Sequence, residues 1–303
     1  MQWRGPNWLS WRHLKANVEM EPKQKSLPGL GVACKLRQPG DCGIARANCR
    51  APKRADTMTC SPPTGPGMRA LIISDLHANL EAVKALPSDV DQIWVLGDLV
   101  NYGPSPAEVI QFIRERATLV VRGNHDNSVG FGEDPRCSAR FRAMAEETGR
   151  FTQSVLTEGD RRYLRSLPLT TTIEADGAQV LMCHAAPADP LFEYRREDSP
   201  QWASDDVAPS IDVELVGHTH IPFQRFLKCR RIANPGSVGQ PKHGHAEARF
   251  AMWQDGNITL GAVPYDVGAT VEKLRHLPLS PEVFDDLVFV LRNGTAPPLL
   301  PES

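Results

Sequence analysis

Short apolar runs rich in β-branched residues alternate with helical patterns along most of this 303-residue chain, from Met68 onward. Such alternation is typical of layered α/β proteins. The expected strands are Arg69–Ser74, Gln92–Gly97, Thr118–Gly123, Gln179–Cys183, Asp212–Gly217, Phe223–Leu227, Arg249–Trp253 and Ile258–Val263. The expected helices are Asn79–Leu86, Pro106–Ala117, Arg136 to about Leu156, Gly268–Leu274 and Pro281–Arg292.

Residues 1–67 differ in composition from the rest of the chain. They contain eleven Lys/Arg against four Asp/Glu, with eight prolines and no sustained helical or strand period, whereas residues 68–303 contain 23 basic against 32 acidic residues. We therefore expect a folded domain over 68–303 and a basic, Pro-rich extension over 1–67 that is disordered or not native. A regulatory or docking arm is the alternative.

Several classes of protein are disfavoured by composition. No stretch approaches the roughly 20 apolar residues of a membrane-spanning helix, and the N-terminus lacks the apolar core of a secretory signal. The seven cysteines show no CxxC spacing, so free thiols in a reducing compartment fit best. A formal charge of -2, without interleaved basic and aromatic residues, argues against nucleic acid or membrane partners. The sequence predicts a cytoplasmic protein and leaves its oligomeric state open.

Metal-competent side chains follow five of the expected strands, directly at the strand ends. In open α/β sheets the carboxyl ends of the strands share one edge, so these groups can meet there. Each group alone has a plainer explanation as a turn or a satisfied polar residue. Together they are harder to explain structurally, because each buried unpartnered polar group costs about 1–3 kcal/mol. The groups are Asp75 with His77, Asp98, Asn124 with His125 and Asp126, His184, and His218 with His220.

Two divalent ions would satisfy this set of donors. Carboxylate oxygen, amide oxygen and imidazole nitrogen suit manganese, iron, zinc, cobalt or nickel, and the absence of a thiolate argues against copper(I) and iron–sulfur clusters. The nearest thiol is Cys183, beside His184. Alternation along a strand turns it toward the opposite face, so we expect it in the core.

Five motifs carry a family resemblance. They are Asp75-Leu76-His77, Gly97-Asp98, Gly123-Asn124-His125-Asp126, His184 and Gly217-His218-Thr219-His220. Their order and approximate spacing resemble those of the calcineurin-like metallophosphoesterase superfamily, over Met68 to about Tyr265. The run Tyr102-Gly103-Pro104 and the segment 234–241 resemble its small bacterial phosphodiesterase branch.

The resemblance implies a fold and a ligand set. The fold would be a four-layer α/β/β/α sandwich of two mixed β-sheets flanked by helices. Two metal ions, with manganese favoured, would be bound, and Asp98 would bridge them. The remaining ligands would be Asp75, His77 and His220 for the first ion, and Asn124, His184 and His218 for the second.

The expected chemistry is phosphate ester hydrolysis. Two ions lower the pKa of a bridging water and neutralise phosphoryl charge, so that a metal-bridging hydroxide can attack in line. His125 is the candidate proton donor to the leaving group, and Asp126 would orient or charge its ring. The alternative is that His125 stabilises the loop or binds phosphate without transferring a proton.

Three residues are candidate substrate contacts: Asn124, Arg122 and Tyr102. The last two have plainer readings, as a solvated arginine and a surface tyrosine. The Asn234–Gly239 turn is expected to supply backbone N–H donors to an anion or to shape the mouth of the site, with a plain turn as the alternative.

The expected substrate is a small phosphodiester or a nucleotide. Protein phosphatases of the superfamily usually have Asp-Arg-Gly where this chain has Asn101-Tyr102-Gly103, and Glu where it has Asp126. A phosphoprotein substrate is therefore disfavoured, while dinucleoside polyphosphate hydrolysis is the closest enzymatic alternative. The non-enzymatic alternative is a metal-retaining binding scaffold, as in the retromer subunit that resembles this superfamily. The complete ligand set and His125 favour catalysis.

Overall fold

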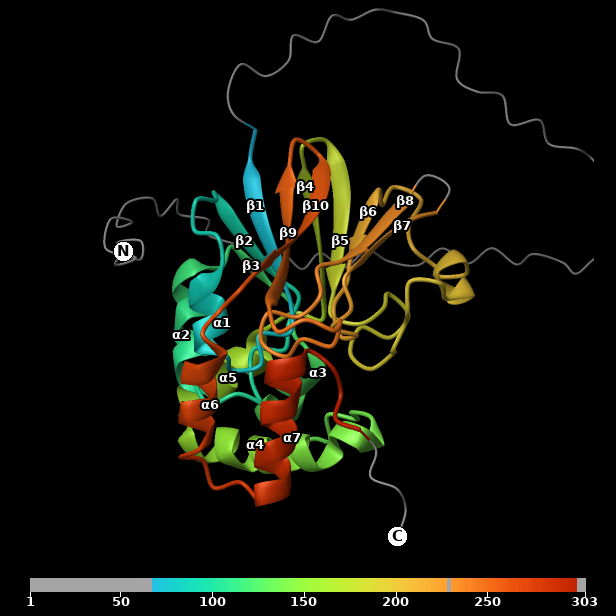
Figure 1. The fold of residues 1–303 in the computed structure, drawn as a ribbon. Coiled ribbons are helices and arrows are strands. Elements are labelled where there is room, and N and C mark those ends of the chain that lie inside the picture. Colours follow the sequence, from blue (N-terminus) through green and yellow to red (C-terminus); the bar gives the residue numbers. More distant parts are fainter. Residues whose placement is uncertain (1–66, 228–229, 299–303) are drawn as a thin grey trace, which may run out of the picture. The chain divides into compact units, whose positions relative to one another are not determined.

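Two five-stranded sheets form the centre of the computed structural model, which describes residues 67–227 and 230–298 (Figure 1). The extension expected over 1–67 lies outside the described residues, apart from Gly67. The first sheet has the order β10-β9-β1-β2-β3 and the second β4-β5-β6-β8-β7. In the first sheet the strands are β1 Arg69–Ile73, β2 Gln92–Val95, β3 Leu119–Val120, β9 Ala248–Gln254 and β10 Asn257–Val263. In the second they are β4 Thr170–Ala175, β5 Ala178–Cys183, β6 Val213–Leu215, β7 Phe223–Leu227 and β8 Arg230–Asn234.

Both sheets are mixed. In the first, β1 pairs in parallel with β2 and antiparallel with β9, with Ile72 opposite Trp94 and Ala251. In the second, β6 lies parallel to both β5 and β8. Parallel neighbours end at the same edge of their sheet, and this places the loops after β1, β2, β5 and β6 where a shared site can form.

The two sheets pack face to face through an apolar layer. Ile72 and Trp94 from the first sheet and Met182 and Leu215 from the second belong to one buried cluster. The rings of Trp94 and Trp253 are fully buried, with centroids 5.7 Å apart. Side chains alternate along each strand, so every second residue of β1 faces this layer and the others face the helices. The central strands are therefore apolar on both faces.

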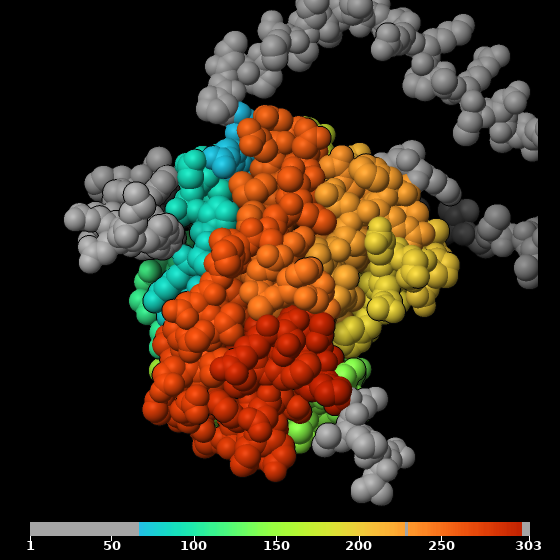
Figure 2. Space-filling view, viewed as in Figure 1, coloured from blue at the N-terminus to red at the C-terminus, as the bar shows by residue number. Residues whose placement is uncertain are grey.

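Helices cover the other face of the first sheet and gather at one end of the described chain (Figure 1). The first group comprises α1 Leu80–Ala85, α2 Pro106–Arg116, α3 Asn124–Phe131 and α5 Glu158–Ser166. The second comprises η1 Ala139–Phe141, α4 Arg142–Val155, α6 Val267–Leu274 and α7 Pro281–Asn293. The C-terminal part of the chain forms most of the face seen in Figure 2. Within the described ranges, no helix is long and apolar enough to cross a membrane.

The outer face of the second sheet is covered differently. The segment 185–211 joins β5 to β6 and contains one short helix, η2 Pro200–Ala203. Four prolines interrupt this segment, which explains why it forms no longer helix. Trp202 packs from it into a cluster with Cys183 and Phe223, so the expected core position of Cys183 is confirmed. The expected fold class, two mixed sheets flanked by helices, is also confirmed.

Candidate metal centre

The loops after β1, β2, β5 and β6, together with the start of α3, bring the expected metal ligands to one place. The ligands form two groups, and within each group the ligand atoms all lie within 4.8 Å of one another. All of these side chains are buried. Asp98 joins them, because its Oδ2 lies 3.7 Å from His77 Nε2 and 3.4 Å from His184 Nε2. Asn124 Oδ1 lies 3.0 Å from His184 Nε2. The two groups are Asp75, His77 and His220, and Asp98, His184 and His218.

Backbone carbonyls fix the tautomer of three of these histidines. The Nδ1 atoms of His77, His184 and His220 lie 3.1, 2.8 and 2.7 Å from the carbonyl oxygens of Val100, Leu96 and Gln240 respectively. A carbonyl oxygen only accepts, so each Nδ1 carries a hydrogen, and each Nε2 presents a lone pair when the ring is neutral. The second nitrogen of each ring is therefore available to a cation.

The presented lone pairs face one another, and this is the test of whether the residues fit two cations. His77 Nε2 and His220 Nε2 are 3.2 Å apart, beside the carboxylate of Asp75. Asp75 Oδ1 is buried without a hydrogen-bond partner. His184 Nε2 faces Asn124 Oδ1 and His218 Nδ1, at 3.0 and 3.1 Å. Acceptors converging this closely require a positive charge between them, and two divalent ions fit.

The electrostatics of the centre favour cation binding. Burial alone would raise the pKa of Asp75, but His220 outweighs it and holds that pKa well below its usual range. Burial lowers the pKa of His77 and of His218. Burial would do the same for His184, but the adjacent Asp98 carboxylate raises its pKa to about 9. Without metal, this pKa favours a second proton on His184, at Nε2, and metal binding there must displace it.

The ligand loops depart from ordinary backbone conformation. Asp75, His77, Asp98, His218 and His220 all have positive φ, between 44° and 65°. Non-glycine residues adopt this region at a cost, and they do so mostly at functional sites. The strained turns let side chains only two residues apart, as in Asp75 and His77, reach the same ion.

Asp126 connects two of the ligand loops through hydrogen bonds to their backbone. Its carboxylate accepts the backbone N–H groups of Asp98, Leu99 and Gly123 at 2.8, 2.8 and 3.0 Å. Burial raises its pKa to about 7. With both oxygens engaged by the backbone, Asp126 does not orient the ring of His125 as expected from the sequence. That role is corrected to support of the Asp98 loop.

Asn101 is the partner of His125 instead. Asn101 Nδ2 lies 3.0 Å from His125 Nδ1, which leaves the other ring nitrogen for a substrate. The backbone N–H of His125 donates to Asp98 Oδ1 at 2.9 Å, so the ring is anchored to the residue that joins the two ligand groups. Burial lowers the pKa of His125 to about 4. The ring is thus neutral at pH 7 in the metal-free chain.

The three expected substrate contacts have other partners. Tyr102 is 4% exposed, and its ring packs 4.8 Å from the rings of both His77 and His125. The guanidinium of Arg122 donates to the carbonyl of Arg165 at 2.8 Å and lies over the ring of Phe131. Asn124 donates through Nδ2 to the carbonyl of Pro135 at 2.7 Å and turns Oδ1 toward His184. Tyr102 and Arg122 therefore act as supports for neighbouring elements, and Asn124 as a candidate ligand.

The Asn234–Gly239 turn also supports the ligand loops. The N–H groups of Val238 and Gly239 donate to the carbonyls of Ser74 and Asp75, both at 3.0 Å. The side chain of Asn234 donates to the Gly217 carbonyl at 2.7 Å. These donors are paired within the protein, so the expectation that the turn offers them to an anion is corrected to a buttressing role.

Two residues beside the centre carried no sequence signal. The ring of Tyr194 is half exposed and lies with its centroid 3.9 Å from that of His218. Lys242 interacts electrostatically with Asp75 and Asp98, and burial lowers its pKa to about 8. Both line a cavity of about 610 Å³. They lie in connecting segments without a strand end or a motif to single them out.

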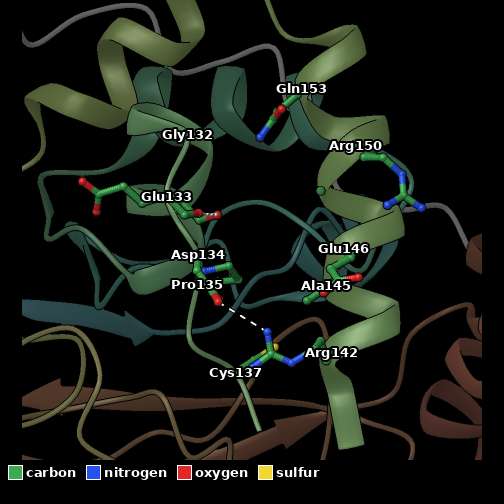
Figure 3. A pocket seen from close by; sticks show the side chains of 12 residues that line it. Gly132, Glu133, Asp134, Pro135, Cys137, Arg142, Ala145, Glu146, Arg150 and Gln153 are labelled. Carbon is green, nitrogen blue, oxygen red and sulfur yellow. Dashed lines mark hydrogen bonds and ion pairs between the residues drawn. The ribbon is translucent and has the colours of Figure 1, made fainter. Parts of the chain in front are cut away.

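A second hollow, of about 370 Å³, lies between the C-terminal end of α3 and α4 (Figure 3). Its walls carry charges of both signs, including the ion pair between Asp134 and Arg142 at 3.3 Å. Its connection to the metal ligands is Pro135, which accepts the hydrogen bond from Asn124. The facing charges neutralise one another, so this hollow has no evident preference for an anion or a cation.

Comparison with known proteins supports the same family. The model of the calcineurin-like phosphoesterase superfamily domain matches residues 68–254. An uncharacterized protein of Methanocaldococcus jannaschii is 33% identical over 226 residues, which are 67% of this chain and 90% of that protein. A symmetrical bis(5'-nucleosyl)-tetraphosphatase of Neisseria meningitidis is 27% identical over 59% of this chain and 62% of that enzyme.

Solved structures agree. A metallophosphoesterase from Sphaerobacter thermophilus is 31% identical with a TM-score of 0.62, and the match covers 74% of this chain and 99% of that one. A hypothetical protein from Pyrococcus horikoshii has a TM-score of 0.63 at 19% identity, covering 76% and 100% of the two chains, and so shares the fold. By its family match, its fold and its two buried ligand groups, this chain belongs to the calcineurin-like phosphoesterase superfamily.

Proposed function

We propose that the chain is a dinuclear metal-dependent phosphoesterase that hydrolyses a small phosphodiester or nucleotide. The observation that supports this most is the convergence of buried acceptor atoms on two adjacent points, with the Asp98 carboxylate between them. A structural role gives no reason to leave such a set without donors. All the expected ligands, and His125, are present.

Different residues of the chain would have different roles in hydrolysis. Bound at the two ligand groups, divalent ions would activate water and neutralise the phosphoryl charge. Asp98 would fix the spacing of the two positions, and the backbone carbonyls behind the histidines would keep their Nε2 lone pairs aimed inward. Manganese is the metal we propose, because hard oxygen donors are mixed with imidazole and no thiolate contributes.

His125 is placed to serve the leaving group. Asn101 occupies Nδ1, so the hydrogen for the departing oxygen would come from Nε2. The ring is neutral in the metal-free chain, and an arriving phosphate would raise its pKa by adding negative charge nearby. His125 would then donate its proton as the ester bond breaks, and Asn101 would hold the ring in position.

Dinucleoside polyphosphate hydrolysis is the second candidate. It is favoured by the relatives named as symmetrical bis(5'-nucleosyl)-tetraphosphatases, although the chain spans only 62% of the Neisseria enzyme. The two candidates share the metal centre and differ in the number of phosphates bound beside it. A substrate panel containing both classes separates them.

The test is hydrolysis of bis(p-nitrophenyl) phosphate by full-length protein with added manganese. Wild type should turn over in proportion to bound metal, and Asp98→Asn should lose about 100-fold or more in kcat, since the shared carboxylate positions both ions. Metal content is measured in parallel. Absence of metal-dependent turnover on every diester, monoester and dinucleotide would contradict the proposal and favour a binding scaffold.

A further inference from the structure

A cavity beside the metal centre is not explained by the ligands themselves. It has a volume of about 610 Å³, within the range typical of pockets for small molecules. One lining residue, Thr219, lies in sequence between the ligands His218 and His220, so the cavity borders the metal centre directly. The lining includes Tyr194, Arg196, Thr219, Ile221, Phe223 and Lys242.

Tyr194 is held at this cavity by its neighbour. Arg195 is 4% exposed, pairs with both Glu193 and Asp205, and lies over the ring of Trp202 at 4.6 Å. Arg195 is buried while the adjacent Tyr194 is half exposed, so the anchored Arg195 holds the loop from which Tyr194 projects. The exposed ring is therefore fixed in place before any ligand arrives.

The surface around Tyr194 suits a planar apolar group. Its ring is 49% exposed on one side and packed against His218 on the other. Ile221, 37% exposed, and Phe223 supply further apolar lining. In Figure 2 the yellow segment that follows β5 adjoins the orange part of the chain. A half-exposed aromatic ring beside apolar side chains is the kind of platform on which nucleobases stack.

The cavity lining carries charges of both signs, and its acidic members are Glu197 and Asp198. Lys242 lines the cavity, interacts electrostatically with the candidate ligands Asp75 and Asp98, and has its ammonium 4.1 Å from the centroid of the Phe141 ring. Arg196 contributes a second cation to the lining. Cations at this position suit the phosphate of a substrate whose ester bond lies at the metals. A simple phosphomonoester would leave the apolar part of the cavity empty.

We infer that this cavity binds the nucleoside part of a nucleotide substrate, with the base stacked on Tyr194 and the phosphate held by Lys242 next to the metal centre. The inference rests on the proposed function and narrows it from small phosphate esters to nucleotides. It assigns the two residues different tasks. Tyr194 recognises the base, whereas Lys242 recognises the phosphate whatever is attached to it.

The experiment measures binding by calorimetry, using manganese-loaded full-length protein and two probes that differ in the base. Adenosine 5'-monophosphate should bind about tenfold more tightly than ribose 5-phosphate, because one stacked base contributes roughly five- to hundredfold in affinity. Equal affinity of the two probes for wild type would overturn the inference.

Variants then separate the two tasks. Tyr194→Ala should reduce the preference for adenosine 5'-monophosphate over ribose 5-phosphate to within about twofold. Tyr194→Phe, which keeps the ring, should retain that preference. Lys242→Met should lower the affinity for both probes by the same factor and leave the ratio of the two affinities unchanged. The matched control is Phe226→Ala, since Phe226 is also an exposed ring, 70% accessible, but lies outside this cavity. A preference that survives Tyr194→Ala, or a Lys242→Met effect on one probe alone, would overturn the assignment.

Failure of the cavity assignment and failure of the proposed function give different results. If esters are hydrolysed with manganese but both probes bind equally, only the nucleotide inference fails. If no ester is hydrolysed but the preference depends on Tyr194, the catalytic proposal fails and a nucleotide-binding protein remains.

Discussion

His125 has an environment suited to a group that acts only when substrate is present. Asn101 fixes one ring nitrogen, the Asp98 carboxylate fixes its backbone, and burial holds its pKa near 4. The sequence was sufficient to single out His125, because it lies beside a strand-end ligand. Its partner could not be predicted, since Asn101 reaches it from another loop and only the folded chain shows which of the nearby polar groups is engaged.

Replacing His125 by alanine should affect substrates according to their leaving groups. Alkyl esters need a proton on the departing oxygen, so kcat should fall by about 10²- to 10³-fold, whereas nitrophenyl esters leave as stable anions and should lose much less. The measurement is kcat across a series of diesters with leaving groups of different pKa, at constant metal content. An equal loss for all leaving groups would show that His125 does not donate a proton.

Most elements could be predicted because their patterns are simple, and the exceptions have physical reasons. The helix α3 has the sequence NHDNSVGF, with no apolar period, because its first turn carries site residues in place of core residues. The helix α5 buries only Leu164, although its capping box of Thr157 and Asp160 was a readable start signal. The strands β4 and β8 were also missed. In the case of β4 the reason is its place at a sheet edge, where much of its length is exposed.

The expected helix from Arg136 begins later, at Arg142. Residues 136–138 instead form a loop that leads into η1, and Arg136 has a φ of 52°, which interrupts any helix there. Helix boundaries depend on such local conformations. By contrast, four of the five strand ends that carry candidate ligands were predicted to within two residues, because each is marked by an apolar run followed by a polar group. The fifth, β3, ends at Val120, three residues before the expected Gly123.

The close packing of the ligand loops makes Gly123 sensitive to substitution. A methyl group there would overlap the backbone nitrogen and Oδ1 of Asp98, so Gly123→Ala should displace Asp98 and lower the bound metal from two ions toward one or none. Metal analysis of the purified protein gives the answer. Gly149→Ala is the matched control, because its methyl group would lie in ordinary contact in the middle of α4. Two ions retained in Gly123→Ala would contradict this account of the loop.

At the scale of the whole described chain, the metal centre joins the two sheets. Asp75 and Asp98 follow strands of the first sheet, whereas His184 and His218 follow strands of the second. Ions bound between them would stabilise the folded chain, since the unfolded chain has no such site. Without ions, the proton on His184 partly replaces the missing positive charge, because the Asp98 carboxylate raises the pKa of that ring to about 9.

Because this proton is bound in place of a metal ion, we expect the stability of the metal-free protein to depend on pH. A histidine whose pKa rises from 6.5 to about 9 on folding contributes stability that is fully present below pH 6.5 and is lost as pH rises through 9. In chelator, the melting temperature of wild type should therefore fall across this window relative to His184→Gln, which lacks the titrating ring. With manganese bound the proton is already displaced, so the fall should disappear and the melting temperature should rise by several degrees, roughly 2–4 °C per kcal/mol of binding energy. If the melting temperatures of metal-free wild type and His184→Gln change by the same amount between pH 6.5 and 9, His184 carries no such proton.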